Sequence, residues 1–258
     1  MTTFIISLRA EFMKIRRSAA FWLVIAGSAF LPALMFLMYT TRPDVFVKRL
    51  GKDPWMGHIL QGFEGASFFL WPMLIIIVAS LVTQIEFRNN TWKQVLASPL
   101  RIGDVYFTKF IVIQCMILSA YLLFNIDMVL TALLTEVFHP AYAFVHNPVP
   151  LRSMLQLDGK SYIAILGMTT IQYCVSLRFK NFIASIGIGL ALIIAGLMMI
   201  PWDKVVYFPY AYSALSFIRN SATATDFKVL KHEYWSLGYF AVFLMLGYLD
   251  FFYRRERG

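Results

Sequence analysis

The chain has 258 residues, of which 59% are hydrophobic and only 14% are charged, and its formal net charge is +9. A soluble domain of this size carries about 25% charged residues, so the composition excludes an ordinary soluble protein and predicts one embedded in a membrane. At this hydropathy, the positive charge fits anchoring at anionic lipid headgroups better than binding of nucleic acid.

The first 18 residues predict a helix that lies in the membrane interface. Apolar side chains recur at spacings of three and four and form one stripe: Phe4, Ile5, Leu8, Phe12 and Ile15. Basic side chains are placed on the opposite side: Arg9, Lys14 and Arg17. This pattern favours an interfacial helix over a simple extension of the first membrane span.

Six apolar segments follow, and a helix needs about 20 mainly apolar residues to cross a bilayer. They cover about residues 19–39, 66–85, 106–135, 162–177, 182–200 and 236–253. The first contains Pro32, which predicts a kink, and the third is long enough that it should tilt, break or project beyond the bilayer. The predicted fold class is therefore an all-α, polytopic membrane protein with six transmembrane helices.

Lysine and arginine residues predict the orientation of these helices, since they concentrate in cytoplasmic segments. With both termini in the cytoplasm, the inner segments hold 13 Lys and Arg among 51 residues, against 10 among 84 in the outer segments. The density of basic residues is therefore about twice as high inside. Residues 86–105 are predicted to lie on the cytoplasmic side.

The cytoplasmic segment 86–105 interrupts the apolar runs and predicts a short amphipathic helix. Asn89 or Asn90 is suited to cap its start, and Pro99 ends it about two turns later. Its apolar face would be formed by Trp92, Val95 and Leu96. A simple hydrophilic connector needs no such face, so the pattern predicts docking to lipid or to protein.

Residues 72–110, PMLIIIVASLVTQIEFRNNTWKQVLASPLRIGDVYFTKF, resemble ABC-type export permeases of the type-2 class. In that family an apolar helix ends in Glu, a polar run with fixed Thr, Lys, Leu and Pro positions follows, and a Lys opens the next helix. The matching positions here are Glu86, Asn90, Thr91, Lys93, Leu96, Pro99, Arg101 and Lys109. The resemblance is nearest to permeases related to lantibiotic immunity and bacitracin resistance.

The resemblance implies a permease subunit of an ATP-driven exporter in the bacterial cytoplasmic (inner) membrane. A second permease copy, identical or related, and separate ABC ATPase subunits would complete the transporter, and the ATPase would bind ATP and Mg. Residues 86–105 would form the coupling segment that the ATPase holds. The residues expected to couple the two proteins are Glu86, Arg88, Asn90, Thr91, Trp92, Lys93, Val95, Leu96 and Pro99.

The chain itself is not expected to hydrolyse ATP. A phosphate-binding loop requires G-x-x-x-x-G-K-[ST], and the nearest match, residues 154–161, has Met154 in place of the first glycine. Cys115 and Cys174 both fall in apolar runs, which argues against a disulfide. His139 and His146 are interpreted as ordinary loop residues rather than metal ligands.

Asp127 and the nearby Asn125 lie inside the third predicted span and are candidates for a transport path, because a carboxylate is costly to bury in a membrane. An interhelical contact without a transport role explains Asp127 equally well. Asp250 and Arg254 are four residues apart in the favourable order, which predicts a local ion pair.

Two other classes of function stay open at this level. A polytopic membrane enzyme acting on lipid-linked substrates would need several titratable residues at one membrane depth, and only Asp127 qualifies. An ion-coupled secondary carrier usually has inverted repeats and several buried polar groups, and neither is evident in the sequence. The transported substrate is not determined by these patterns.

Overall fold

The computed structural model describes residues 2–16, 18–51, 53–88, 101–220 and 230–255. All regular elements in these ranges are helical, in agreement with the predicted all-α fold. In chain order they are α1 (Thr2–Ile15), α2 (Ala19–Thr41), α3 (Pro43–Leu50), α4 (Pro54–Gly65), η1 (Ala66–Leu70), α5 (Trp71–Arg88), α7 (Ile102–Phe138), η2 (Pro140–Tyr142), α8 (Leu151–Arg178), α9 (Phe182–Met198), η3 (Asp203–Tyr207), η4 (Pro209–Ala211), α10 (Tyr212–Asn220) and α11 (Lys231–Arg255).

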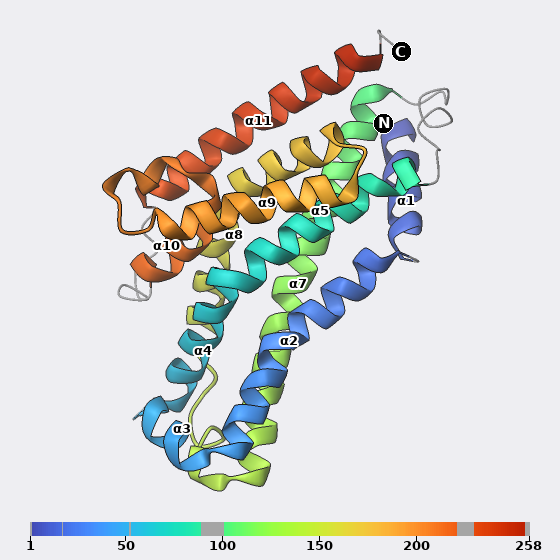
Figure 1. The fold of residues 1–258 in the computed structure, drawn as a ribbon. Coiled ribbons are helices and arrows are strands. Elements are labelled where there is room, and N and C mark those ends of the chain that lie inside the picture. The colour runs from blue at the N-terminus through green and yellow to red at the C-terminus, as the bar shows by residue number, and fades with distance from the viewer. Residues whose placement is uncertain (1, 17, 52, 89–100, 221–229, 256–258) are drawn as a thin grey trace.

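The helix α7 organises the molecule and runs along most of its length (Figure 1). It has 37 residues, which at 1.5 Å per residue is about 55 Å, against about 30 Å for the hydrocarbon core of a bilayer. α2 lies along α7, and α1 packs beside its first turns. α8 packs against both α11 and α5, and α9 packs on α5. The long third segment is thus one unbroken helix.

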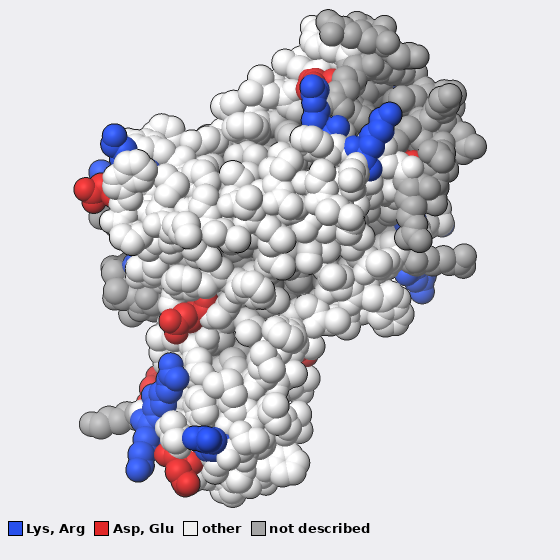
Figure 2. All heavy atoms as spheres, in the orientation of Figure 1, with Lys and Arg blue, Asp and Glu red and all other residues white. Residues whose placement is uncertain are grey.

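Within the described residues, four helices are long and apolar enough to cross a membrane: Ala19–Thr41, Pro54–Phe87, Ile102–Phe138 and Lys231–Tyr253. α9 is apolar but has 17 residues, and α8 is longer but carries charged side chains near its start. Figure 2 shows charged side chains mainly around the margins of this face, with a broad uncharged surface between them. The protein is therefore a multi-pass membrane protein.

The helices extend beyond the predicted apolar spans. α3 and α4 occupy residues that the sequence assigned only to an outer connection between 41 and 65. Asp53 caps α4 by accepting a hydrogen bond from the Met56 amide at 3.0 Å, and Pro54 occupies the first turn. α4 then continues through the π-helical Ala66–Leu70 into α5. Hydropathy alone predicts that this helix begins at residue 66. The Asp53 cap and the burial of one face of α4 let it begin at Pro54.

Hydrogen bonds tie the helices together at the end of the molecule where α3 lies. The Tyr142 hydroxyl donates to the Tyr39 carbonyl of α2 at 2.9 Å. The Trp55 indole of α4 donates to the Phe144 carbonyl at 2.8 Å. Nearer the middle, the Thr131 hydroxyl of α7 donates to the Pro32 carbonyl of α2 at 3.3 Å. The parts of α2, α4 and α7 that lie toward this end therefore form one packed unit.

A buried polar layer joins α5, α8 and α9. The Ser185 hydroxyl lies 2.9 Å from that of Ser80 and 2.8 Å from that of Ser176. On the same side of α8, the Tyr210 hydroxyl donates to the Gln172 side-chain oxygen at 2.9 Å. These buried side chains are hydrogen-bonded to one another, so the layer holds the three helices in a fixed register at little cost in desolvation.

The helix ends that border the predicted inner segments lie together. Figure 1 places α1, the end of α5, the start of α7 and the end of α11 at one end of the molecule, with α3 at the other. The turn between α8 and α9 joins this group, because the Gln84 amide of α5 donates to the Phe179 carbonyl at 3.0 Å. All of these segments are thus available to one compartment.

Candidate functional site

A buried network of ion pairs connects α1, α5 and α7. The Lys109 ammonium donates to Glu11 Oε2 and to Glu86 Oε1, both at 2.8 Å. The Lys14 ammonium reaches Glu11 Oε1 at 2.5 Å and Glu86 Oε1 at 3.0 Å. The side chains of Lys109 and Glu86 are each 1% exposed, and that of Lys14 is 33% exposed. We call these residues, Glu11, Lys14, Glu86 and Lys109, the charge network.

Each member of the charge network is placed by its helix. Glu86 lies in the last turn of α5, and Lys109 lies two turns into α7. Glu11 and Lys14 are three residues apart on α1, so they are neighbours on one face. Glu86 and Lys109 thus lie on either side of the segment 89–100, and the network fixes α5, α7 and α1 to one another at that point.

The network balances two carboxylates against two ammonium groups. A buried charge is costly unless it is paired and hydrogen-bonded, and here each charge has two partners of opposite sign. The second oxygen of Glu86, Oε2, is buried and has no hydrogen-bond partner among the residues that the structure describes. The balance makes the network stable as a whole and sensitive to the loss of any single member.

The pKa of Glu11 shows this balance. Burial by itself raises the pKa of the Glu11 carboxyl, but Lys109 and Lys14 outweigh burial, so its pKa lies below the ordinary value of 4.5. Burial lowers the pKa of Lys14, and the Glu11 and Glu86 carboxylates more than reverse this, so its pKa lies above 10.5. Both shifts favour the charged, paired state at neutral pH.

Acid is therefore expected to destabilise the network through Glu11. A carboxyl with a lowered pKa in the folded state contributes stability above its unfolded pKa and loses it as the pH falls through the folded value. We expect the melting temperature to fall below pH 4.5, and to fall less steeply in Glu11→Gln, which has no proton to gain. Melting curves from pH 7 to pH 3 test this, with the exposed Glu64→Gln as the control; equal slopes in all three proteins would contradict it.

The buried face of α1 differs from the predicted stripe. Ser7, Glu11 and Ile15 are buried, and the Ser7 hydroxyl lies 3.1 Å from that of Thr108. Of the apolar stripe, Ile5 and Phe12 are exposed. The assignment of Lys14 to an outward basic face was wrong, because its ammonium turns inward to the two carboxylates. Polar partners on α5 and α7, which periodicity cannot detect, set the rotation of this helix.

The predicted transport-path residues do not lie together. The Asn125 amide donates to Asp158 Oδ2 of α8 at 2.6 Å. Asp127 is half-buried and makes no hydrogen bond or ion pair with the described part of the chain. Residues two apart on a helix do not share a face, so Asn125 faces α8 and Asp127 does not. Asp158 was missed, because it falls before the fourth predicted span.

Most predicted coupling residues lie outside the described residues. Arg88 ends α5, and its side chain is not described. The others outside the described residues are Asn90, Thr91, Trp92, Lys93, Val95, Leu96 and Pro99. Of the predicted coupling set, Glu86 alone has a described side chain, and it belongs to the charge network.

The near match to a phosphate-binding loop is part of a helix. Residues 154–161 lie within α8, where backbone amides are engaged in helical hydrogen bonds. The Lys160 ammonium donates to the Asn220 side-chain oxygen at 3.1 Å in a buried contact. A helix interior cannot surround a phosphate with free amides, so the resemblance of this stretch to a phosphate-binding loop is accidental.

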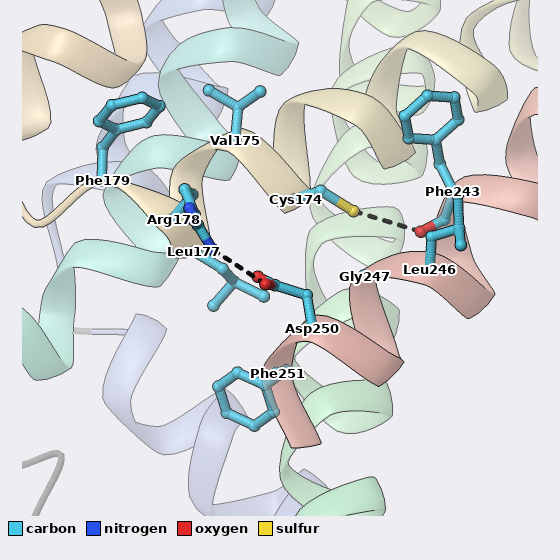
Figure 3. Close-up of a pocket in the computed structure, with 10 residues that line it drawn as sticks. All are labelled: Cys174, Val175, Leu177, Arg178, Phe179, Phe243, Leu246, Gly247, Asp250 and Phe251. Atoms are coloured by element: carbon cyan, nitrogen blue, oxygen red, sulfur yellow. Dashed lines mark hydrogen bonds and ion pairs between the residues drawn. The ribbon is translucent and has the colours of Figure 1, made fainter. Parts of the chain in front are cut away.

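A groove of about 330 Å³ lies between the C-terminal halves of α8 and α11 (Figure 3). At its edge Arg178 pairs with Asp250, Nη1 to Oδ1, at 2.9 Å. The predicted pairing of Asp250 with Arg254 stays a prediction, because the Arg254 side chain lies outside the described residues. Arg178 of the neighbouring helix is a partner that the sequence did not predict. Cys174 also lines the groove, and both it and Cys115 are free thiols.

The model of the ABC-2 family transporter protein matches residues 7–196. The chain belongs to the ABC-2 transporter family. No curated protein and no solved structure matched the chain. As an ABC-2 family member with apolar membrane helices, it is a permease, the transport component in the membrane of an ABC transporter, and the family implies partnering with an ABC ATPase subunit.

The ABC-2 match contains the whole charge network, including the residue that sequence reasoning missed. Glu11 was not singled out, although it lies four residues before Ile15 and three after Leu8, on the apolar side of the helix. A carboxylate in that position predicts a buried partner. Glu86 and Lys109 of the permease were recognised from the motif, but only the structure shows that they contact each other.

Proposed function

We propose that this ABC-2 permease is the membrane subunit of an exporter driven by a separate ATPase that holds residues 86–105. The observation that carries the proposal is the charge network, which joins the two helix ends bordering that segment. Lys109 of α7 contacts Glu86 of α5 directly, and both contact α1. A force applied to the segment would therefore reach α5, α7 and α1 together.

This coupling acts through rigid helices. α5 continues α4 without a break, and α7 runs to the opposite end of the molecule, where both helices join the packed unit around Tyr39 and Trp55. The continuous helix α4–α5 and the helix α7 would transmit movement from the cytoplasmic end to the outer end. Closure of the ATPase would thus alter the outer opening of the transporter by rigid-body motion.

The proposed topology has six spans, with both termini in the cytoplasm of a bacterium and the chain in its inner membrane. The common end of α1, α5, α7 and α11 supports this arrangement (Figure 1), together with the bias of basic residues toward the same segments. α8 and α9 would be the fourth and fifth spans, with Gln172 and Ser176 of α8 turned toward the serines of α5 and α9. The first helix α1 would lie at the inner interface.

Accessibility of single cysteines tests the topology. In a variant without Cys115 and Cys174, a cysteine at position 93 is expected to resist a membrane-impermeant maleimide added outside, whereas one at position 147 should react. The reason is that the Asn147 carbonyl accepts from the Trp55 indole of α4 at 3.1 Å, in the packed unit beside α3 and away from the charge network. Labelling at 93 and protection at 147 in intact cells would reverse the orientation.

The complete transporter would contain a second permease copy, identical or related, and ATP with Mg would be bound by the ATPase. We assign the chain to the branch related to lantibiotic immunity and bacitracin resistance on the motif between residues 72 and 110. Asp127 is retained as a candidate for the transport path because it is half-buried within α7 with no described partner.

Measurements of ATP hydrolysis test whether the permease or a separate subunit is the ATPase. The purified permease, free of contaminating ATPases, is expected to hydrolyse no ATP, because its one near match to a phosphate-binding loop is helical. An ATPase subunit that co-purifies with the permease should hydrolyse ATP, and its rate should respond to the transported substrate. Hydrolysis by the permease alone would refute the proposal.

A further inference from the structure

A second groove lies between α1, α2 and the middle of α7. Its volume is about 340 Å³, close to that of the groove in Figure 3. Most of the side chains that line it are apolar, and Phe12, Phe21 and Ile25 are exposed at the surface, so the groove is open. Its lining residues include Phe12, Phe21, Val24, Ile25, Met116 and Leu123.

Arg16 marks one end of this groove. Ser7 meets Thr108 and Pro32 meets Thr131, so α1 and α2 follow α7 in the same direction. Arg16, directly after α1, therefore lies on the side of the charge network, and Leu123 lies toward the membrane interior. From Cys115 to Leu123 the groove extends about 12 Å along α7, at 1.5 Å per residue.

The two grooves differ in the charge at their edge. Arg178 is neutralised by Asp250 at 2.9 Å (Figure 3). Arg16 is exposed and forms no ion pair within the ranges that the structure describes. Each groove also contains one cysteine, Cys115 or Cys174. The chain thus provides a charged groove and a neutralised one of similar size.

We propose that the groove between α1, α2 and α7 binds an anionic phospholipid, with one acyl chain along α7 and the headgroup phosphate against Arg16. The apolar walls match an acyl chain, and a guanidinium pairs with phosphate in a planar, bidentate contact. The apolar outward side of α1, with Ile5, Ile6 and Met13 exposed, places this helix among lipids. The site does not depend on the ATPase or on the transported substrate.

Reactivity of the two cysteines provides the test, with the full chain carrying either Cys174→Ala or Cys115→Ala. Each single-cysteine protein is reconstituted into phosphatidylcholine vesicles with or without phosphatidylglycerol. The rate of reaction with the uncharged N-ethylmaleimide is then followed by mass spectrometry. Because an anionic surface lowers the local pH for both thiols, Cys174 reports the general effect of the vesicle and Cys115 reports occupancy of the groove.

Phosphatidylglycerol is expected to slow the reaction of Cys115 about fivefold relative to Cys174, the effect of one basic residue at an anionic surface. Arg16→Gln should remove this protection and Arg16→Lys should keep most of it. Arg9→Gln, which removes an exposed arginine of α1 away from the groove, should leave the protection intact.

Several results would overturn the proposal. Equal slowing of both cysteines, or protection that persists in Arg16→Gln, would show that Arg16 does not select an anionic lipid. Protection by soluble glycerol phosphate in detergent would assign the groove to free phosphate rather than lipid. Protection that rises with the protein-to-lipid ratio and ignores the headgroup would assign it to a second copy of the chain. None of these results bears on ATP hydrolysis, so the proposed function is tested separately.

Discussion

Replacing Lys109 by alanine is expected to destabilise the protein by about 3 kcal/mol or more, because it leaves buried carboxylates without their main counter-ion. Lys109 holds both Glu11 and Glu86 at 2.8 Å, and Lys14, which is partly exposed, cannot neutralise both. For a chain of this size the loss corresponds to a fall of roughly 10 °C in melting temperature. Thermal unfolding of the purified permease in detergent measures it.

Two further variants distinguish destabilisation caused by breaking the charge network from destabilisation caused by removing any lysine. Lys180→Ala, at an exposed position in the turn between α8 and α9, should leave the melting temperature unchanged. Glu86→Gln combined with Lys109→Met removes one charge of each sign and leaves Glu11 with Lys14, so most of the stability should return. If Lys109→Ala melts like the wild type, the charge network does not hold α1, α5 and α7 together.

Trp92→Ala is expected to weaken association with the ATPase roughly 30-fold. Interface free energy concentrates in a few anchors rich in Trp, Tyr and Arg, and truncation of such an anchor commonly costs about 2 kcal/mol, with 1.4 kcal/mol per tenfold change in Kd. Val95→Ala and Leu96→Ala remove less apolar surface and should cost less. Titration of the permease with its ATPase measures the three affinities.

Trp22→Ala is the matched control, since Trp22 is an exposed tryptophan on α2 outside the coupling segment. It should leave ATPase affinity unchanged, and membrane insertion should be normal in both variants because no span changes its hydropathy materially. If the segment merely rests on lipid headgroups, Trp92→Ala will leave the ATPase bound. Unchanged binding and unchanged transport together would exclude residue 92 as an anchor.

The sequence predicted the parts of this protein that depend on local composition. A bilayer requires about 20 apolar residues in each helix that crosses it, so helices were expected where α2, α5, α7, α8, α9 and α11 lie. The motif around Glu86 and Lys109 identified the family because the spacing of residues is itself the signal. Both deductions use only residues near one another in the chain.

The tertiary structure decided which side chains meet across helices. Glu11 and Lys109 are 98 positions apart, and Arg178 and Asp250 are 72 apart, so no periodicity within one helix predicts either contact. The same contacts set the rotation of α1, turning Lys14 inward against the amphipathic pattern. In a membrane, apolar faces are satisfied by lipid as well as by protein. The rotation and pairing of helices therefore depend on a few polar partners, and those partners are brought together only by the fold.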